Sequence, residues 1–292
     1  MSYKYTKKHD SIKRPPTGTA HQVRVPLFLP VNQVRSSTGK NVKTENKDEW
    51  KYESQHGLVT VRHHRLTQAH RNIVEVILTH YKPAFIHSDG SWEFHFTLYD
   101  LQKNLKKTSK TNNHWVRTKL DELQGVQLVV EPTGGKPFKR ITCSVLNDHS
   151  VTSSSTGRTG EHMHAVTFNR HYMRFFDVDT HLHTEKLTDD IIALHNATVQ
   201  ALVRYCLSHN ALNMKLNQVL NNIGISEKFL PASTVTRTRK KVFEMKPQLE
   251  HFGIHINDEK PHVVSYKKHS DVWFATPSDF NSRSIDGPDT GN

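Results

Sequence analysis

The alternation of apolar and polar positions predicts helices and short strands in the first half of the chain. The segment "LTQAHRNIVEVILTHY" repeats apolar residues at helical spacing, among them Ile73 and Ile77, and Thr67 is a suitable cap residue. "WEFHF" alternates as a strand does, and "LYDLQKNL" follows as a short helix. A second helix, "HWVRTKLDELQ", is expected to stop at Gly125. "VQLVV" and "ITCSVL" then flank the turn "EPTGGKPFKR" as a hairpin.

The second half repeats this order of elements. "DDIIALHNATVQALVRYCLSHN" predicts a long helix, "ALNM" a short strand and "LNQVLNNIG" a short helix. After the turn "ISEKFLPAS", Ser233 is expected to cap a helix from Thr234 to Met245, which Pro247 ends or kinks. "GIHIN" and "HVVSYKK" predict a closing hairpin.

This repeated order predicts an α+β fold made of two tandem winged-helix (helix-turn-helix) domains. We expect a basic, flexible N-terminal arm over residues 1–56, a first winged helix over 57–146 and a second over 165–276. The Ser/Thr/Gly-rich residues 147–164 predict a flexible loop or linker, and residues 277–292 predict a disordered tail. Within the arm, the apolar segment "VPLFLPV" is a candidate to dock on a folded neighbour.

The net charge of the chain indicates which class of molecule it binds. The 292 residues carry a formal net charge of +12 with a pI near 9.6, which favours nucleic acid or another anionic surface. No segment approaches the roughly 18 apolar residues of a membrane span, and the basic N-terminus lacks the apolar region of a signal peptide. Cys143 and Cys206 lie in apolar stretches, as reduced core residues of a cytosolic protein do.

In a winged helix, the helix after the turn fits the major groove and the hairpin lies along the DNA backbone. The candidate DNA-binding residues are therefore Asn113, His114, Arg117, Thr118 and Lys119 in the first half, with Lys136, Lys139 and Arg140 in its hairpin, and Ser233, Thr236, Arg237, Arg239, Lys240 and Lys241 in the second half. A basic helix is often only a solvated face. Here residues 97–120 and 228–246 each hold six Lys or Arg and one acid at equivalent places, which favours DNA binding.

The chain resembles the replication initiator proteins of iteron-containing bacterial plasmids over residues 58–275. The resemblance rests on the two successive units, on the segment "FNRHYMRFFDVDTHLHTEKLT" between them and on the basic helix "RTRKKVF". It implies that the second unit reads half of a repeated origin sequence, whereas the first contacts the remainder and mediates dimerisation. Monomers would open the origin and dimers would repress their own gene. Host replication proteins, such as a helicase or an initiator, would be partners in the bacterial cytoplasm, and no cofactor is implied.

Two alternatives stay open. A winged-helix transcriptional repressor would show the same basic helices. From another class, "HMH" (His162, His164) and "HLH" (His181, His183) match the His-hydrophobic-His pattern of metal-dependent nicking endonucleases, with Tyr172 or Tyr205 as nucleophile. This pattern is short, and a chain with 22 histidines produces it readily by chance. The sequence holds no P-loop motif. We therefore predict a protein that binds and distorts DNA without a catalytic step.

Overall fold

The computed structural model describes residues 16–24, 27–31, 49–54, 57–107, 112–132, 140–155, 162–173, 181–225 and 230–275. Over these ranges the chain has a mixed α+β fold with several antiparallel sheets and one hydrophobic core in each half. None of the helices in these ranges is long and apolar enough to span a membrane. The predicted tail, residues 277–292, lies outside the described residues.

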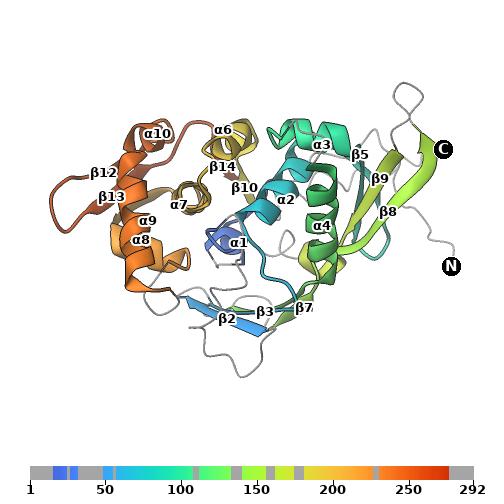
Figure 1. Ribbon diagram of the computed structural model, residues 1–292, viewed down its shortest axis with the longest axis horizontal. Helices are drawn as coiled ribbons and strands as arrows, with labels where there is room; N and C mark the ends of the chain where they lie inside the picture. The colour runs from blue at the N-terminus through green and yellow to red at the C-terminus, as the bar shows by residue number, and fades with distance from the viewer. Residues whose placement is uncertain are drawn as a thin grey trace, which may run out of the picture.

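The first half combines three helices with a four-stranded sheet (Figure 1). In chain order its elements are α2 (Gln68–His80), β4 (Pro83–Ile86), β5 (Trp92–Thr97), α3 (Leu98–Asn104), α4 (Asn112–Gly125), β8 (Leu146–Ser155) and β9 (His162–Phe168). The strand order is β4-β5-β9-β8. Thr97 fixes the junction between β5 and α3, because its Oγ1 accepts a hydrogen bond from the Asp100 N–H at 3.1 Å. The helices and the strand "WEFHF" predicted for this half are confirmed.

The second half has a similar order of elements around its own core. They are η3 (Glu185–Leu187), α6 (Thr188–Ala193), α7 (Ala197–Leu207), β11 (Ala211–Lys215), α8 (Leu216–Asn222), α9 (Ala232–Glu244), α10 (Lys246–Glu250), β12 (Ile254–Ile256) and β13 (Val263–Lys267). The three strands pair in the order β11-β13-β12. The long helix predicted here is in fact two, α6 and α7, because Asn196 caps a new helix by accepting from the Val199 N–H at 3.1 Å. The predicted interruption near Pro247 is confirmed, since α10 begins beside it.

A separate sheet contains the hairpin that was predicted to follow α4. Its strands are β2 (Glu49–Ser54), β3 (Gly57–Arg62), β6 (Gln127–Pro132) and β7 (Ile141–Cys143), in the order β2-β3-β6-β7. The hairpin itself exists, with Val129 opposite Thr142. However, β6 pairs with β3 and not with β5, so the expectation that this hairpin belongs to the sheet of the first unit is wrong. In Figure 1 this sheet lies below the helices.

The hairpin that does pair with β5 comes from the segment predicted as a linker. Residues 147–155 lie in β8 and residues 162–164 in β9, so the prediction of a flexible loop over 147–164 is wrong for both stretches. Residues 156–161 lie outside the described residues. β9 continues to Phe168, which pairs with Trp92 of β5, so the predicted start of the second unit at residue 165 is also too early. Backbone pairing and the buried Val166 and Phe168 outweigh the Ser/Thr-rich composition.

Parts of the predicted N-terminal arm are built into the fold. β1 (Gly18–Thr19) pairs with β10 (His181–His183), which in turn pairs with β14 (Trp273–Ala275). The short helix α1 (Ala20–Arg24) follows β1 and lies between the two halves, beside α7 (Figure 1). Leu27 and Phe28 are buried in the core of the first half, which confirms that "VPLFLPV" docks there. The expectation of a flexible arm is therefore wrong for residues 16–24, 27–31 and 49–54.

Candidate nucleic-acid interface

Helix α9 presents most of the predicted DNA-binding residues of the second half on one face. Val235 and Val242 are buried and hold the opposite face against the core. At 100° per residue, the positions turned away from those valines are the exposed side chains of Ser233, Thr236, Arg237, Lys240 and Lys241. The same outward face also carries one acid, Glu244, at the C-terminal end of the helix.

The cations on this face lack ion-pair partners in the part of the chain that the structure describes. Within the ranges that the structure describes, Arg237, Lys240 and Lys241 form no ion pair, although many other surface charges do. Like charges one helical turn apart repel each other. The face of α9 is therefore suited to an external polyanion that offsets this repulsion.

Two predictions for α9 need correction. Ser233 does not cap the helix, which begins at Ala232 with Pro231 in the cap position. Arg239 lies four residues after Val235 and three before Val242, so it falls on the inner stripe of the helix. Its side chain is half-buried, and its Nε has no hydrogen-bond partner among the described residues. The spacing of the charged residues alone did not reveal this orientation.

Helix α4 occupies the corresponding place in the first half and is less basic on its outward side. Val116, Leu120 and Leu123 are buried. Of the residues predicted to face the DNA, His114 and Arg117 are exposed and Thr118 is half-buried. The Thr118 Oγ1 donates a hydrogen bond to the His114 carbonyl oxygen at 2.9 Å. Asn113 is exposed, and its Oδ1 accepts a hydrogen bond from Gln102 Nε2 of α3.

Lys119 does not point outward as predicted. Its Nζ lies 2.6 Å from Glu122 Oε2, and its side chain is only 14% exposed. The same oxygen of Glu122 lies 2.6 Å from His70 Nε2 of α2. Burial opposes ionisation of Glu122, but the hydrogen bonds from His70 and Lys119 lower its pKa to about 2. Lys119 therefore helps to fix α4 against α2 and is a poor candidate for a DNA contact.

The tautomer of His70 follows from its two hydrogen bonds. The Thr67 backbone N–H donates to His70 Nδ1 at 2.9 Å, so Nδ1 accepts and Nε2 carries the proton that is given to Glu122. Burial lowers the pKa of His70 although Glu122 favours its charged form. A neutral His70 thus links the start of α2 to α4.

A second histidine contact supports α4 from the sheet side. The Nδ1 atom of His149, in β8, lies 3.2 Å from Oδ1 of Asp121 in α4. The Nε2 atom of the same ring lies 3.0 Å from Nδ1 of His164 in β9. The His164 ring stacks on Phe96 at 6.4 Å between centroids. Burial, followed by the nearby His149 and Arg117, lowers the pKa of His164 to about 4. This chain of contacts joins α4 to the sheet through two histidine rings.

Of the predicted wing residues of the first half, the structure describes only Arg140. Lys136 and Lys139 lie outside the described residues. Arg140 precedes β7 in the separate sheet and is exposed, with its Nε 3.5 Å from Glu131. The hairpin of the second half is closer to its helix, because His262 before β13 contacts the Phe243 ring at 4.5 Å between centroids. Lys246 also pairs with Asp258 in the turn between β12 and β13.

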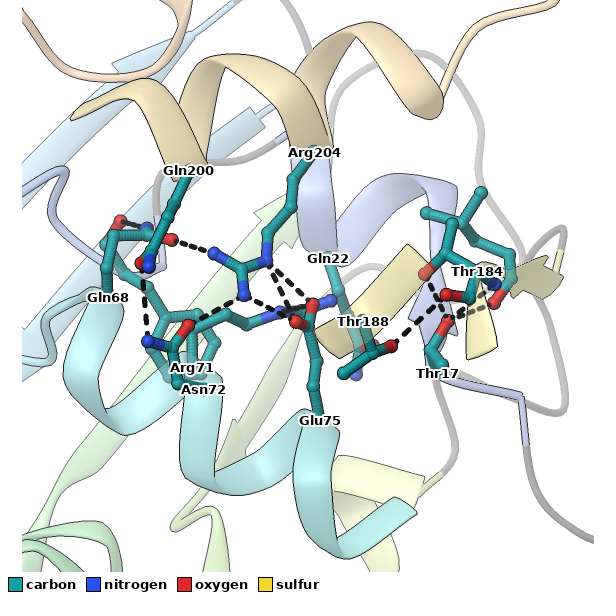
Figure 2. Close-up of polar contacts among 12 residues, drawn as sticks. Thr17, Gln22, Gln68, Arg71, Asn72, Glu75, Thr184, Thr188, Gln200 and Arg204 are labelled. Atoms are coloured by element: carbon teal, nitrogen blue, oxygen red, sulfur yellow. Dashed lines mark hydrogen bonds and ion pairs between the residues drawn. The ribbon is translucent and has the colours of Figure 1, made fainter. Parts of the chain in front are cut away.

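The two halves meet at a buried polar network, which the sequence reading missed (Figure 2). Arg204 of α7 donates from Nε and Nη2 to Glu75 of α2 at 2.6–3.0 Å, and from Nη1 to Gln68 at 2.7 Å. Its Nη2 also reaches Asn72 at 2.7 Å, and Arg71 Nε donates to Glu75 at 2.7 Å. Burial would raise the pKa of Glu75, but the two guanidinium groups hold it below its usual range. The sequence signal for this contact was a charged residue among the apolar residues of each helix, Glu75 in α2 and Arg204 in α7.

The residues nominated for a nicking nuclease are mostly buried. Tyr172 and Tyr205 are both fully buried, and burial raises the pKa of Tyr172 to about 12. The Tyr205 hydroxyl oxygen accepts from Asn222 Nδ2 at 2.7 Å. Of the two histidine pairs, both of which lie in strands, only His162 is exposed. Among the residues with described positions, no group of three or more His, Cys, Asp or Glu is arranged to hold a metal ion.

Comparisons with protein-family models, with curated proteins and with solved structures found no match to this chain.

Proposed function

We propose that each half is a winged helix, with α4 and α9 as the helices that enter the major groove. In the second half, α7, β11, α8, α9 and the β12–β13 hairpin follow the helix-strand-helix-helix-hairpin order of that fold. In the first half, α2, β5, α3, α4 and the β8–β9 hairpin do so, with β6 and β7 inserted after α4. In both sheets, the hairpin strand that comes later in the chain lies between two other strands. This strand is β13, between β11 and β12, in the second half, and β9, between β5 and β8, in the first half.

We propose further that the protein binds double-stranded DNA in a sequence-specific manner. The observation that carries this proposal is the outward face of α9, where Arg237, Lys240 and Lys241 are exposed and form no ion pair within the described ranges. Thr236 and Arg237, in the middle of that face, are the side chains best suited to base edges. Lys240 and Lys241 suit phosphates, which fix the position of the helix on the duplex. Arg117 of α4 is the corresponding candidate in the first half.

The biological role that we propose is initiation of plasmid replication. It rests on the resemblance of the chain to iteron-binding initiators. The protein would bind repeated origin sequences, dimerise through its first half and recruit host replication proteins in the bacterial cytoplasm. A repressor that recognises a single operator would use the same helices. We propose no catalytic step, because the tyrosines nominated as nucleophiles are buried.

The first experiment is to incubate the purified protein with fragmented DNA of its own replicon and to sequence what is retained. The salt concentration should be near physiological, about 150 mM. Enrichment of one region with several direct repeats is the expected result for an initiator. A single inverted repeat at a promoter would instead favour the repressor. Retention of all fragments alike would contradict sequence-specific binding.

A pair of matched triple variants ties the result to α9. Arg237→Ala, Lys240→Ala and Lys241→Ala together should abolish enrichment. The control, Lys51→Ala, Lys82→Ala and Lys186→Ala, removes three exposed cations from other elements and changes the net charge equally. It should keep the enrichment. Equal loss in both variants would mean that only net charge matters, and α9 would then lose its assigned role.

A further inference from the structure

The junction between the two halves contains a small pocket beside the Arg204–Glu75 contact. The pocket has a cavity volume of about 30 Å³ and lies between α1, α2 and α7. Its polar lining includes Gln22, Arg71 and Arg204, and Phe28 and Ile223 contribute apolar surface. A cavity of this size has room for about two waters or one small ligand. The pocket therefore touches the N-terminal segment and both halves of the protein.

Among the described residues, the buried charges around the pocket do not balance. Arg71 and Arg204 are 3% and 5% exposed, and both contact the single carboxylate of Glu75, which is 3% exposed. Two guanidinium groups against one carboxylate leave one positive charge in excess. A buried charge without a counter-charge is costly, because the interior solvates it poorly. This excess favours an anion from outside the chain.

The two described residues that keep free donors, Arg71 and Gln22, both line the pocket. Arg204 uses all three of its nitrogens for Glu75, Gln68 and Asn72. Arg71, by contrast, uses only its Nε, for Glu75. Its guanidinium is held by the Phe28 ring, whose centroid lies 5.5 Å away. Its terminal nitrogens form no hydrogen bond within the described residues.

Gln22 adds a second unsatisfied donor. Its side chain is 2% exposed, and its Nε2 has no partner among the residues that the structure describes. Exchanging the amide oxygen and nitrogen would not help, because Oε1 already accepts from the Thr19 N–H at 3.1 Å. A buried amide donor costs free energy unless an acceptor reaches it. An acceptor in the pocket would satisfy Gln22 and Arg71 together.

We propose that this pocket binds a small monovalent anion, a halide or a single carboxylate group, between Arg71 and Gln22. Its charge would offset the excess of the two arginines, and its lone pairs would accept from both donors. Because Gln22 belongs to α1, Arg71 to α2 and Arg204 to α7, the bound anion would join all three elements (Figure 2). The anion thus stabilises the placement of the two halves, whatever the protein binds elsewhere.

The test is the thermal unfolding midpoint of the full chain, with chloride or formate replacing gluconate at constant ionic strength. Gluconate, with six carbons, is expected to be excluded as a whole ion from a cavity of about 30 Å³. The midpoint of the unchanged protein should rise with chloride or formate, because a ligand bound only by the folded state stabilises it. Gln22→Met, of similar size but without a donor, should lose this rise. Lys82→Met, which removes an exposed cation elsewhere, should keep it.

A direct measurement locates the anion in the unchanged protein, without relying on the stability of a variant. Crystals grown with bromide should show an anomalous-scattering peak between Arg71 and Gln22. A peak there, absent in Gln22→Met crystals, supports the proposal. No peak and no anion-dependent rise would mean that the pocket holds water only. An equal rise in the unchanged protein, Gln22→Met and Lys82→Met would mean that anions act on the whole surface, and either result overturns the proposal.

Discussion

Arg204 of α7 binds both carboxylate oxygens of Glu75 of α2, at 2.6–3.0 Å, where each residue is no more than 5% exposed. The pair joins the first helix of one half to the corresponding helix of the other. The neighbouring Gln68 and Asn72 complete the hydrogen bonding of the guanidinium group.

Glu75→Gln should destabilise the protein strongly. The substitution leaves two buried guanidinium groups without their carboxylate, and breaking such a pair costs about 3–5 kcal/mol of unfolding free energy. Denaturant titration followed by circular dichroism measures the loss. Lys186→Ala is the control, since it breaks a pair with Asp271 whose lysine is 78% exposed, and it should cost less than about 1 kcal/mol. Similar losses for both variants would show that the junction pair has no special role.

Arg237→Ala and Arg239→Met should differ in their effect on DNA affinity. Arg237 is exposed on the outward face of α9, so its truncation should cost about 1–3 kcal/mol at the cognate site. Arg239 is half-buried on the inner stripe, and Arg239→Met should leave affinity nearly unchanged. Fluorescence anisotropy with the enriched DNA fragment and a scrambled one gives both values. The opposite ranking would show that α9 turns its other side to the DNA.

Lys240→Ala should weaken binding to cognate and scrambled DNA alike. A lysine that contacts a phosphate releases a counterion, so its removal should reduce the slope of log affinity against log salt by about 1. Lys119→Met should leave that slope unchanged, because Lys119 pairs with Glu122. Titrations at four or more salt concentrations measure both slopes. A reduced slope for Lys119→Met would mean that the lysine leaves Glu122 when DNA binds.

Stability should fall as the pH is lowered from about 6.5 towards 4. The pKa of His164 is lowered from 6.5 to about 4 in the folded protein, so the unfolded chain binds more protons across that window. The contribution of His164 to the unfolding free energy is therefore fully present above its unfolded pKa and is lost as the pH falls towards its folded pKa. Unfolding free energies measured between pH 4 and 7 should show the fall.

His164→Phe should flatten that pH dependence, because it keeps the ring stack on Phe96 and removes the titrating group. His255→Phe, at an exposed position of β12, should leave the profile as it is. Carboxylates such as Glu122, whose pKa is lowered from 4.5 to about 2 on folding, change stability mainly below pH 4.5. An unchanged profile in His164→Phe would assign the pH dependence to other groups.

Periodicity alone determined most elements of the two halves. Val116, Leu120 and Leu123 mark the buried stripe of α4, and Val235 and Val242 mark that of α9. These patterns are local, because a helix or strand needs only its own spacing of apolar residues to specify which face is buried. Thr97 at the start of α3 was likewise predictable, since a capping hydrogen bond spans only three residues.

Strand pairing and the direction of individual charges were decided by the tertiary structure. Both "VQLVV" and the Ser-rich segment after Val145 can form strands, and only their partners, β3 and β9, determine which hairpin joins which sheet. Arg239 and Lys119 are as basic in sequence as Arg237, but burial and Glu122 turn them away from the surface. The Arg204–Glu75 contact joins residues 129 positions apart. Such contacts depend on how whole elements pack, and no local pattern specifies that.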